Sequence, residues 1–118
     1  MITGAHTIIY AQDPDAARAF FRDVLGLSNV DAGDGWLIFK LPPAELASHP
    51  SGPDSSGKVE LYLMCDDLAA TIKELDAKGV QFTSEVTELS WGLLTTLHVP
   101  GAGEIGLYQP RHPVAYDL

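Results

Sequence analysis

The sequence predicts an α+β fold in which two βαβββ modules form one domain over residues 1–118. Three observations predict it. A β-prone run followed by a capped helix occurs twice along the chain. The two copies align without a gap at a spacing of 53 residues. Between them lies a linker-like stretch, residues 50–57, rich in Pro, Ser and Gly. Neither half is large enough to bury a good core alone.

The first module is expected over residues 1–52. Residues 7–11 are rich in β-branched and aromatic side chains and predict a strand. Asp13 is a good N-cap, apolar residues then recur at helical spacing, and Gly26 should end the helix. Short strands joined by tight turns are expected over residues 28–50.

The second module is expected over residues 58–110, with a tail over residues 111–118. Its first strand is predicted at residues 59–65, and Asp66 or Asp67 should cap the helix that follows. Gly79 should end that helix. Two or three further strands are expected at about residues 80–89, 91–99 and 104–109.

The repeat also predicts where a site would form. Each four-stranded sheet has a helix on one face, so its other face stays partly open. Two such sheets can curve into a cleft that alternate residues of each strand line. The identities that carry the repeat are Asp13/Asp66, Ala16/Ala69, Ala17/Ala70, Asp23/Asp76 and Gly26/Gly79.

Composition excludes several classes of function. The formal net charge of −9 disfavours binding to a phosphate backbone, so no nucleic-acid partner is expected. No apolar run approaches the roughly 20 residues that span a bilayer, and the start of the chain lacks the pattern of a secretory signal. Cys65 is the single cysteine, which excludes an intramolecular disulfide. A cytoplasmic domain without a membrane partner is therefore expected.

Four segments resemble a known family. His6–Asp13 and Ala19–Leu27 are similar to the opening of the vicinal oxygen chelate superfamily, which includes glyoxalase I, bleomycin-resistance proteins and extradiol dioxygenases. Glu60–Leu68 resembles the start of its second module, and Pro100–Pro110 resembles its closing strand. The resemblance implies the glyoxalase/bleomycin-resistance/dioxygenase-like fold, a small-molecule ligand and a homodimer.

The resemblance also implies a metal site. Carried over by position, the family's ligands fall on His6, Glu45 and Glu60, and the fourth position is Gly106, which offers no ligand atom. Such a set could hold Zn, Ni, Mn, Fe or Co, with Glu45 or Glu60 as the catalytic base. The missing carboxylate argues against dioxygenase and glyoxalase I chemistry. The alternative is a metal-free pocket in which these are ordinary strand residues.

Alternation along the strands then predicts which side chains share the cleft. The tyrosines could offer hydroxyl groups to a ligand. The two tryptophans, Trp36 and Trp91, occupy matching positions in the two halves and could form walls for a planar molecule or pack symmetrically in the core or at an interface. His49 could be a reserve ligand, general base or surface residue. The expected substrate-binding residues are Tyr10, Trp36, His49, Tyr62, Met64, Trp91 and Tyr108.

Two functions are compatible with these residues. The first is a small-molecule-binding protein of the glyoxalase/bleomycin-resistance type that acts as a metal-dependent lyase, isomerase or dioxygenase on adjacent substrate oxygens. The second is a non-catalytic binding or resistance protein that sequesters a planar drug or metabolite. The scaffold hosts many chemistries, so the fold alone selects neither.

Overall fold

The computed structural model describes residues 7–45, 47, 50, 52–54, 56 and 58–116. These residues form an α+β arrangement, as the sequence predicts, and contain no helix that is long and apolar enough to cross a membrane. In chain order the elements are α1 (Pro14–Ala19), the π-helical turn η1 (Phe20–Val24), β1 (Asn29–Asp31), β2 (Leu37–Phe39), β3 (Tyr62–Met64), α2 (Leu68–Ala77), β4 (Thr87–Leu89), β5 (Gly92–Val99) and β6 (Gly103–Pro110).

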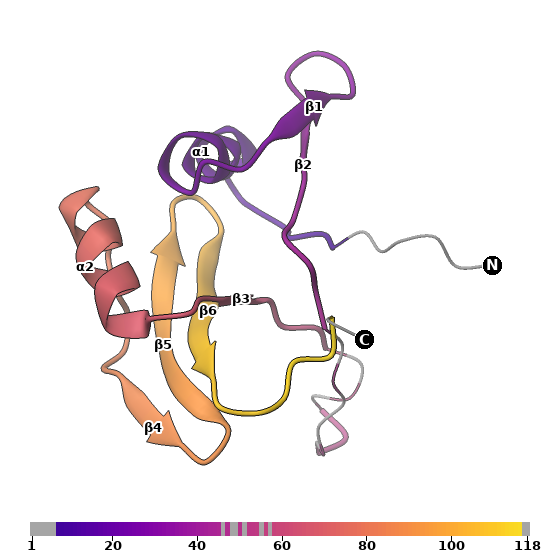
Figure 1. Cartoon of the computed structure of the whole chain (residues 1–118). Helices are drawn as coiled ribbons and strands as arrows, with labels where there is room; N and C mark the ends of the chain where they lie inside the picture. Colours follow the sequence, from indigo (N-terminus) through magenta and orange to yellow (C-terminus); the bar gives the residue numbers. More distant parts are fainter. Residues whose placement is uncertain are drawn as a thin grey trace.

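The second half of the chain forms a four-stranded sheet with the order β3-β6-β5-β4 (Figure 1). β3 runs parallel to β6, whereas β6, β5 and β4 pair antiparallel, so the sheet is mixed. Gly101 and Gly103 adopt positive φ angles of 77° and 93° and turn the hairpin between β5 and β6. Together with α2, these strands give the βαβββ order expected of the second module.

The two faces of this sheet differ in burial because side chains alternate along each strand. One face packs against α2, whose Leu68 and Leu75 belong to the core. The other face is partly exposed and carries Tyr62, Met64 and Tyr108. The buried strand residues on the core face are Thr95, Leu97, Val99, Ile105 and Leu107.

Both helical segments begin and end near the predicted residues, although the first changes from α-helix to the π-helical turn η1 at Phe20. The Asp13 carboxylate accepts a hydrogen bond from the Ala16 N–H at 3.1 Å, and Asp67 accepts one from Ala70 at 3.0 Å. Asp67 rather than Asp66 is therefore the N-cap of α2. After the helices, Gly26 and Gly79 take positive φ angles of 67° and 82°, a conformation that glycine adopts without steric strain.

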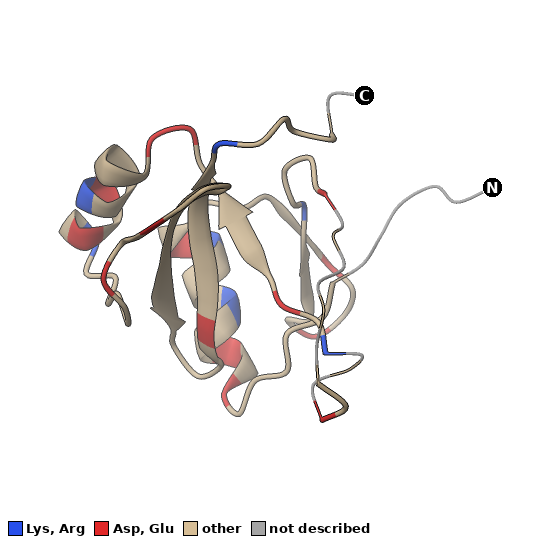
Figure 2. Ribbon diagram, turned by 90° about the horizontal axis from the view of Figure 1, so that it is seen from below, with Lys and Arg blue, Asp and Glu red and all other residues tan. Residues whose placement is uncertain are grey.

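The first half of the chain joins the sheet through α1. The backbone N–H of Asp13 donates to the carbonyl of Gly101 at 3.0 Å, which ties the start of α1 to the β5–β6 turn (Figure 1). Ala17 and Phe20 are buried in the same core as α2 and β5. Charged residues lie mainly on helices and connections (Figure 2), and β3 and β5 contain no Asp, Glu, Lys or Arg.

The first half differs from the expected βαβββ pattern. β1 and β2 form a separate antiparallel pair, with Val30 opposite Ile38. Residues 7–11 form no strand, and the side chain of Tyr10 is 88% exposed. A strand needs a neighbouring backbone for its N–H and C=O groups, and no described segment pairs with residues 7–11. The described part of the first half thus shows two strands where the pattern predicts four.

Candidate functional site

Three aromatic side chains meet on the exposed face of the sheet. Tyr62 pairs with Gly106 and Met64 pairs with Tyr108, so the two tyrosines lie on the same face. The ring centroids of Tyr62 and Tyr108 are 6.1 Å apart, and those of Trp91 and Tyr108 are 5.5 Å apart. Both pairs pack edge to face, an arrangement that aromatic rings favour. We call Tyr62, Trp91 and Tyr108 the aromatic cluster.

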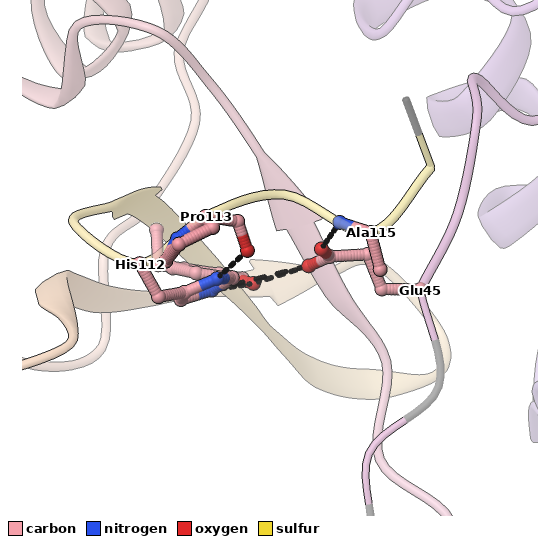
Figure 3. A network of polar contacts seen from close by, with 5 residues as sticks. Glu45, His112, Pro113 and Ala115 are labelled. Atoms are coloured by element: carbon pink, nitrogen blue, oxygen red, sulfur yellow. Dashed lines mark hydrogen bonds and ion pairs between the residues drawn. The ribbon is translucent and has the colours of Figure 1, made fainter. Parts of the chain in front are cut away.

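Glu45 reaches this cluster from the segment after β2. Its Oε1 accepts a hydrogen bond from the Tyr108 hydroxyl at 3.3 Å, and its Oε2 accepts one from the Ala115 N–H at 2.6 Å (Figure 3). Nε2 of His112 lies 3.9 Å from Oε1. The Glu45 side chain is 15% exposed, so these contacts replace much of the hydration that the carboxylate loses.

His112 lies beside the same phenol. Its Nε2 is 3.3 Å from the Tyr108 hydroxyl, and the two ring centroids are 6.0 Å apart. Its Nδ1 is 2.9 Å from the carbonyl of Pro113. A carbonyl only accepts hydrogen bonds, so Nδ1 carries the proton in this contact and Nε2 faces the phenol.

The two tyrosines of the cluster are held in their neutral form. Burial, reinforced by the Glu45 carboxylate, raises the pKa of Tyr108 above its usual value. The hydrogen bond from the Tyr62 hydroxyl to Glu60 Oε2, at 2.8 Å, is the main cause that raises the pKa of Tyr62. Both phenols therefore keep their protons at neutral pH and can act as hydrogen-bond donors.

A cavity of about 300 Å³ opens next to the cluster, at the ends of β3 and β6. That volume is at the lower end of the range for small-molecule sites, roughly 300–1,000 Å³. Met64, the register partner of Tyr108, connects the cavity to the cluster. The lining residues are Met64, Cys65, Asp66, Gln109, Pro110 and Tyr116. Burial raises the pKa of the Cys65 thiol in this wall.

A second cavity, of about 320 Å³, lies between η1 and the end of α2. Phe20, Val80 and Lys78 are among the residues around it. None of the residues predicted for the site lines this cavity, so the cavity beside Met64 is the candidate site.

The structure describes two of the three residues that the resemblance implies as metal ligands, Glu45 and Glu60. In the part of the chain that the structure describes, no three His, Cys, Asp or Glu side chains gather where they could hold a metal ion. Glu60 accepts a hydrogen bond from the Tyr62 hydroxyl. Glu45 accepts hydrogen bonds from the Tyr108 hydroxyl and the Ala115 N–H. At Gly106, the fourth position of the implied metal set, a Cβ atom would collide with the Tyr62 ring. The ring therefore occupies the space that a side chain there would need. His6 lies outside the described residues.

The other predicted residues divide into three groups. Tyr62, Met64, Trp91 and Tyr108 come together, as the cleft prediction requires. Tyr10 and Trp36 lie elsewhere: Tyr10 is exposed, and Trp36, 63% exposed, lies 4.7 Å under the Arg18 guanidinium. The two tryptophans therefore do not form a matched pair. His49 lies outside the described residues.

The structure adds three residues that the sequence did not place at the site. His112, Ala115 and Tyr116 belong to the tail, which follows the repeat and carries no motif. They reach the cluster only because the chain turns back after β6 and meets Glu45, which is 70 residues away from Ala115 in sequence. No local pattern encodes a contact of that separation.

Comparison with known proteins identifies relatives of most of the chain. Residues 5–100 match the family model described as Glyoxalase/Bleomycin resistance protein/Dioxygenase superfamily. No curated protein matches the chain.

Several solved structures share the fold. A lactoylglutathione lyase from Agrobacterium tumefaciens is 21% identical with a TM-score of 0.64, covering 91% of this chain and 92% of that one. The antibiotic binding protein TnmS3 from a Streptomyces species is 22% identical with a TM-score of 0.65, over 93% and 98% of the two chains. A superfamily member from Sphaerobacter thermophilus is 22% identical with a TM-score of 0.61, over 92% and 98%. At such identities the likeness shows the fold alone.

Proposed function

The chain belongs to the glyoxalase/bleomycin resistance protein/dioxygenase superfamily, and from this premise we propose that it binds a small planar molecule beside Tyr108 without transforming it. The observation that carries the proposal is the aromatic cluster next to a cavity of about 300 Å³. The cavity lining combines apolar Met64 and Pro110 with polar Asp66 and Gln109, and polar groups placed in this way can orient a small molecule. An antibiotic binding protein of the same fold supports a binding role.

The polar groups of the site define the chemistry of the ligand. Aromatic rings favour a flat, apolar molecule. Glu45 is an acceptor that is largely shielded from water, so the ligand should also carry an N–H or O–H group. The phenols of Tyr62 and Tyr108 donate their protons to Glu60 and Glu45, so their oxygens can accept a hydrogen bond from an N–H or O–H of the ligand. We therefore expect an uncharged or cationic planar compound rather than an anion.

A fluorescent probe tests this proposal. N-phenylnaphthylamine is neutral, has a flat naphthalene ring and carries one N–H group. It should bind saturably, and Tyr108→Ala should weaken its affinity about tenfold, which corresponds to about 1.4 kcal/mol. Tyr10→Ala, at an exposed tyrosine away from the cluster, is the matched control and should leave the affinity unchanged. Circular dichroism confirms that both variants fold. Non-saturable binding, or equal effects of the two substitutions, would contradict the proposal.

A divalent-metal-dependent lyase, isomerase or dioxygenase is the second candidate. It is favoured by the position of Glu45 and Glu60, which each contact one tyrosine of the Tyr62–Tyr108 pair. Metal analysis of the purified protein separates the two candidates. Stoichiometric metal that is lost on His6→Ala supports the enzyme, whereas metal-free protein that still binds the planar probe supports the binding role.

A homodimer and a cytoplasmic location belong to the same proposal. Apolar side chains remain exposed along residues 7–10, on the β1–β2 pair and before β3, which one chain does not cover. A second copy of the chain could cover them, and the fold's usual sites form between modules. The residues concerned include Ile8, Tyr10, Val30, Trp36 and Val59.

A further inference from the structure

The last described segment of the chain crosses the candidate site. Residues 111–116, which we call the strap, follow β6 directly. Arg111 fixes the root of the strap: its N–H donates to the Trp91 carbonyl at 2.8 Å, and its guanidinium contacts Glu88 at 2.7 Å. The strap lies outside residues 5–100, which match the family model.

The far end of the strap is held separately, by Glu45. The Ala115 N–H donates to Glu45 Oε2 at 2.6 Å, a short hydrogen bond to a charged acceptor (Figure 3). Between the two anchors, His112 lies against the Tyr108 ring, with centroids 6.0 Å apart. After Ala115, Tyr116 forms one wall of the cavity beside Met64. The strap therefore runs along the aromatic cluster and supplies part of the wall of the adjacent cavity.

We propose that the strap is an autoinhibitory closure of the binding site and that Glu45 is its latch. The Glu45 carboxylate accepts one hydrogen bond from the strap, from the Ala115 N–H at Oε2, and one from β6, from the Tyr108 hydroxyl at Oε1. A ligand whose N–H or O–H takes the place of the Ala115 N–H at Glu45 Oε2 releases the end of the strap. The root at Arg111 is held by other groups, so it stays in place when the latch opens.

This inference rests on the proposed function only in taking the region under the strap as the binding site. The latch itself can be tested without a ligand. Exchange of the Ala115 amide hydrogen, followed by NMR, reports the latch directly. In the unmodified chain this hydrogen should exchange at least about tenfold more slowly than in an unstructured peptide. Glu45→Ala should remove that protection, whereas Glu74→Ala, at an exposed site on α2, should leave it unchanged. Unprotected Ala115 in the unmodified chain would overturn the latch.

Cys65 provides an independent readout of closure. It is the single cysteine and lines the cavity that Tyr116 walls. Its reaction with dithiobis(nitrobenzoate) should therefore become several-fold faster in Glu45→Ala and stay the same in Glu74→Ala. Equal rates in all three proteins would contradict closure by the strap.

A second variant tests the latch independently in case Glu45→Ala does not fold. Ala115→Pro removes the N–H donor and leaves the Glu45 carboxylate in place. It should accelerate the Cys65 reaction as Glu45→Ala does, and an unchanged rate would overturn the proposal. Failure of N-phenylnaphthylamine to bind, with the latch confirmed by amide exchange, would instead count against the proposed function alone.

Discussion

The ring of Tyr62 occupies the space above Gly106, the position at which the family resemblance implies a metal-binding carboxylate. Gly106 has no positive φ angle, so its backbone would accept other residues. What excludes a side chain there is the neighbouring ring. At this residue pair, the Tyr62 ring occupies the space that a side chain at position 106 would need.

Gly106→Ala tests this steric relation. The added Cβ collides with the Tyr62 ring, so we expect the free energy of unfolding to fall by about 1–3 kcal/mol. In a Tyr62→Ala background the collision is absent, and the same substitution should leave the free energy of unfolding unchanged or raise it by up to about 1 kcal/mol, since glycine weakens a strand relative to alanine. Urea unfolding of the four proteins measures both differences. Equal losses in the two backgrounds would show that the ring is not the obstacle.

At the scale of the element, α2 combines a local signal with tertiary burial. Asp67 caps its first turn, and Gln109 of β6 also accepts a hydrogen bond from the Leu68 N–H at 2.9 Å. Leu68 and Leu75, which face the sheet, are buried. The helix therefore begins at a residue that both the sequence and the sheet specify.

Two neighbouring aspartates make a matched test of this cap. Asp67→Ala removes the acceptor of the Ala70 N–H and should lower the free energy of unfolding by about 1 kcal/mol. Asp66→Ala, one residue earlier and outside the cap, should change it by less than about 0.5 kcal/mol. Thermal or urea unfolding distinguishes the two variants. A larger effect at Asp66 would show that Asp66, and not Asp67, caps α2.

In the molecule as a whole, the two halves of the chain differ in how much β-sheet their described residues form. The second half has a four-stranded sheet covered by α2, whereas β1 and β2 form a separate pair. β3 pairs only with β6, so its other edge has no partner among the described strands. Val59, just before β3, is 84% exposed. An open strand edge beside exposed apolar residues is a common docking surface for another chain.

Sedimentation analysis tests the proposed dimer. The protein should sediment as a dimer at micromolar concentration, and Val59→Lys should weaken the association at least about tenfold because it places a charge in the apolar patch. Glu74→Lys, at an exposed site on α2, is the control and should leave the association unchanged. A monomer at all concentrations would contradict the proposal.

Much of the fold follows from local sequence. The caps at Asp13 and Asp67, the helix ends at Gly26 and Gly79, and the β5–β6 turn are all where short-range rules predict them. Residues 7–11 differ because a strand depends on a partner, which propensity does not supply. For the site, the sequence correctly joined Tyr62, Met64 and Tyr108 through strand alternation. It also predicted a paired arrangement of Trp36 and Trp91, which the structure does not show.

Local sequence is enough to specify the family, the two capped helices and the face of β3 and β6 that carries the tyrosines, because periodicity and capping act over a few residues. Folding of the whole chain is needed to bring the Tyr62 ring over Gly106 and to place Glu45 against both Tyr108 and Ala115. The contacts of Glu45 join residues 63 and 70 positions apart, and such contacts depend on how the whole chain packs.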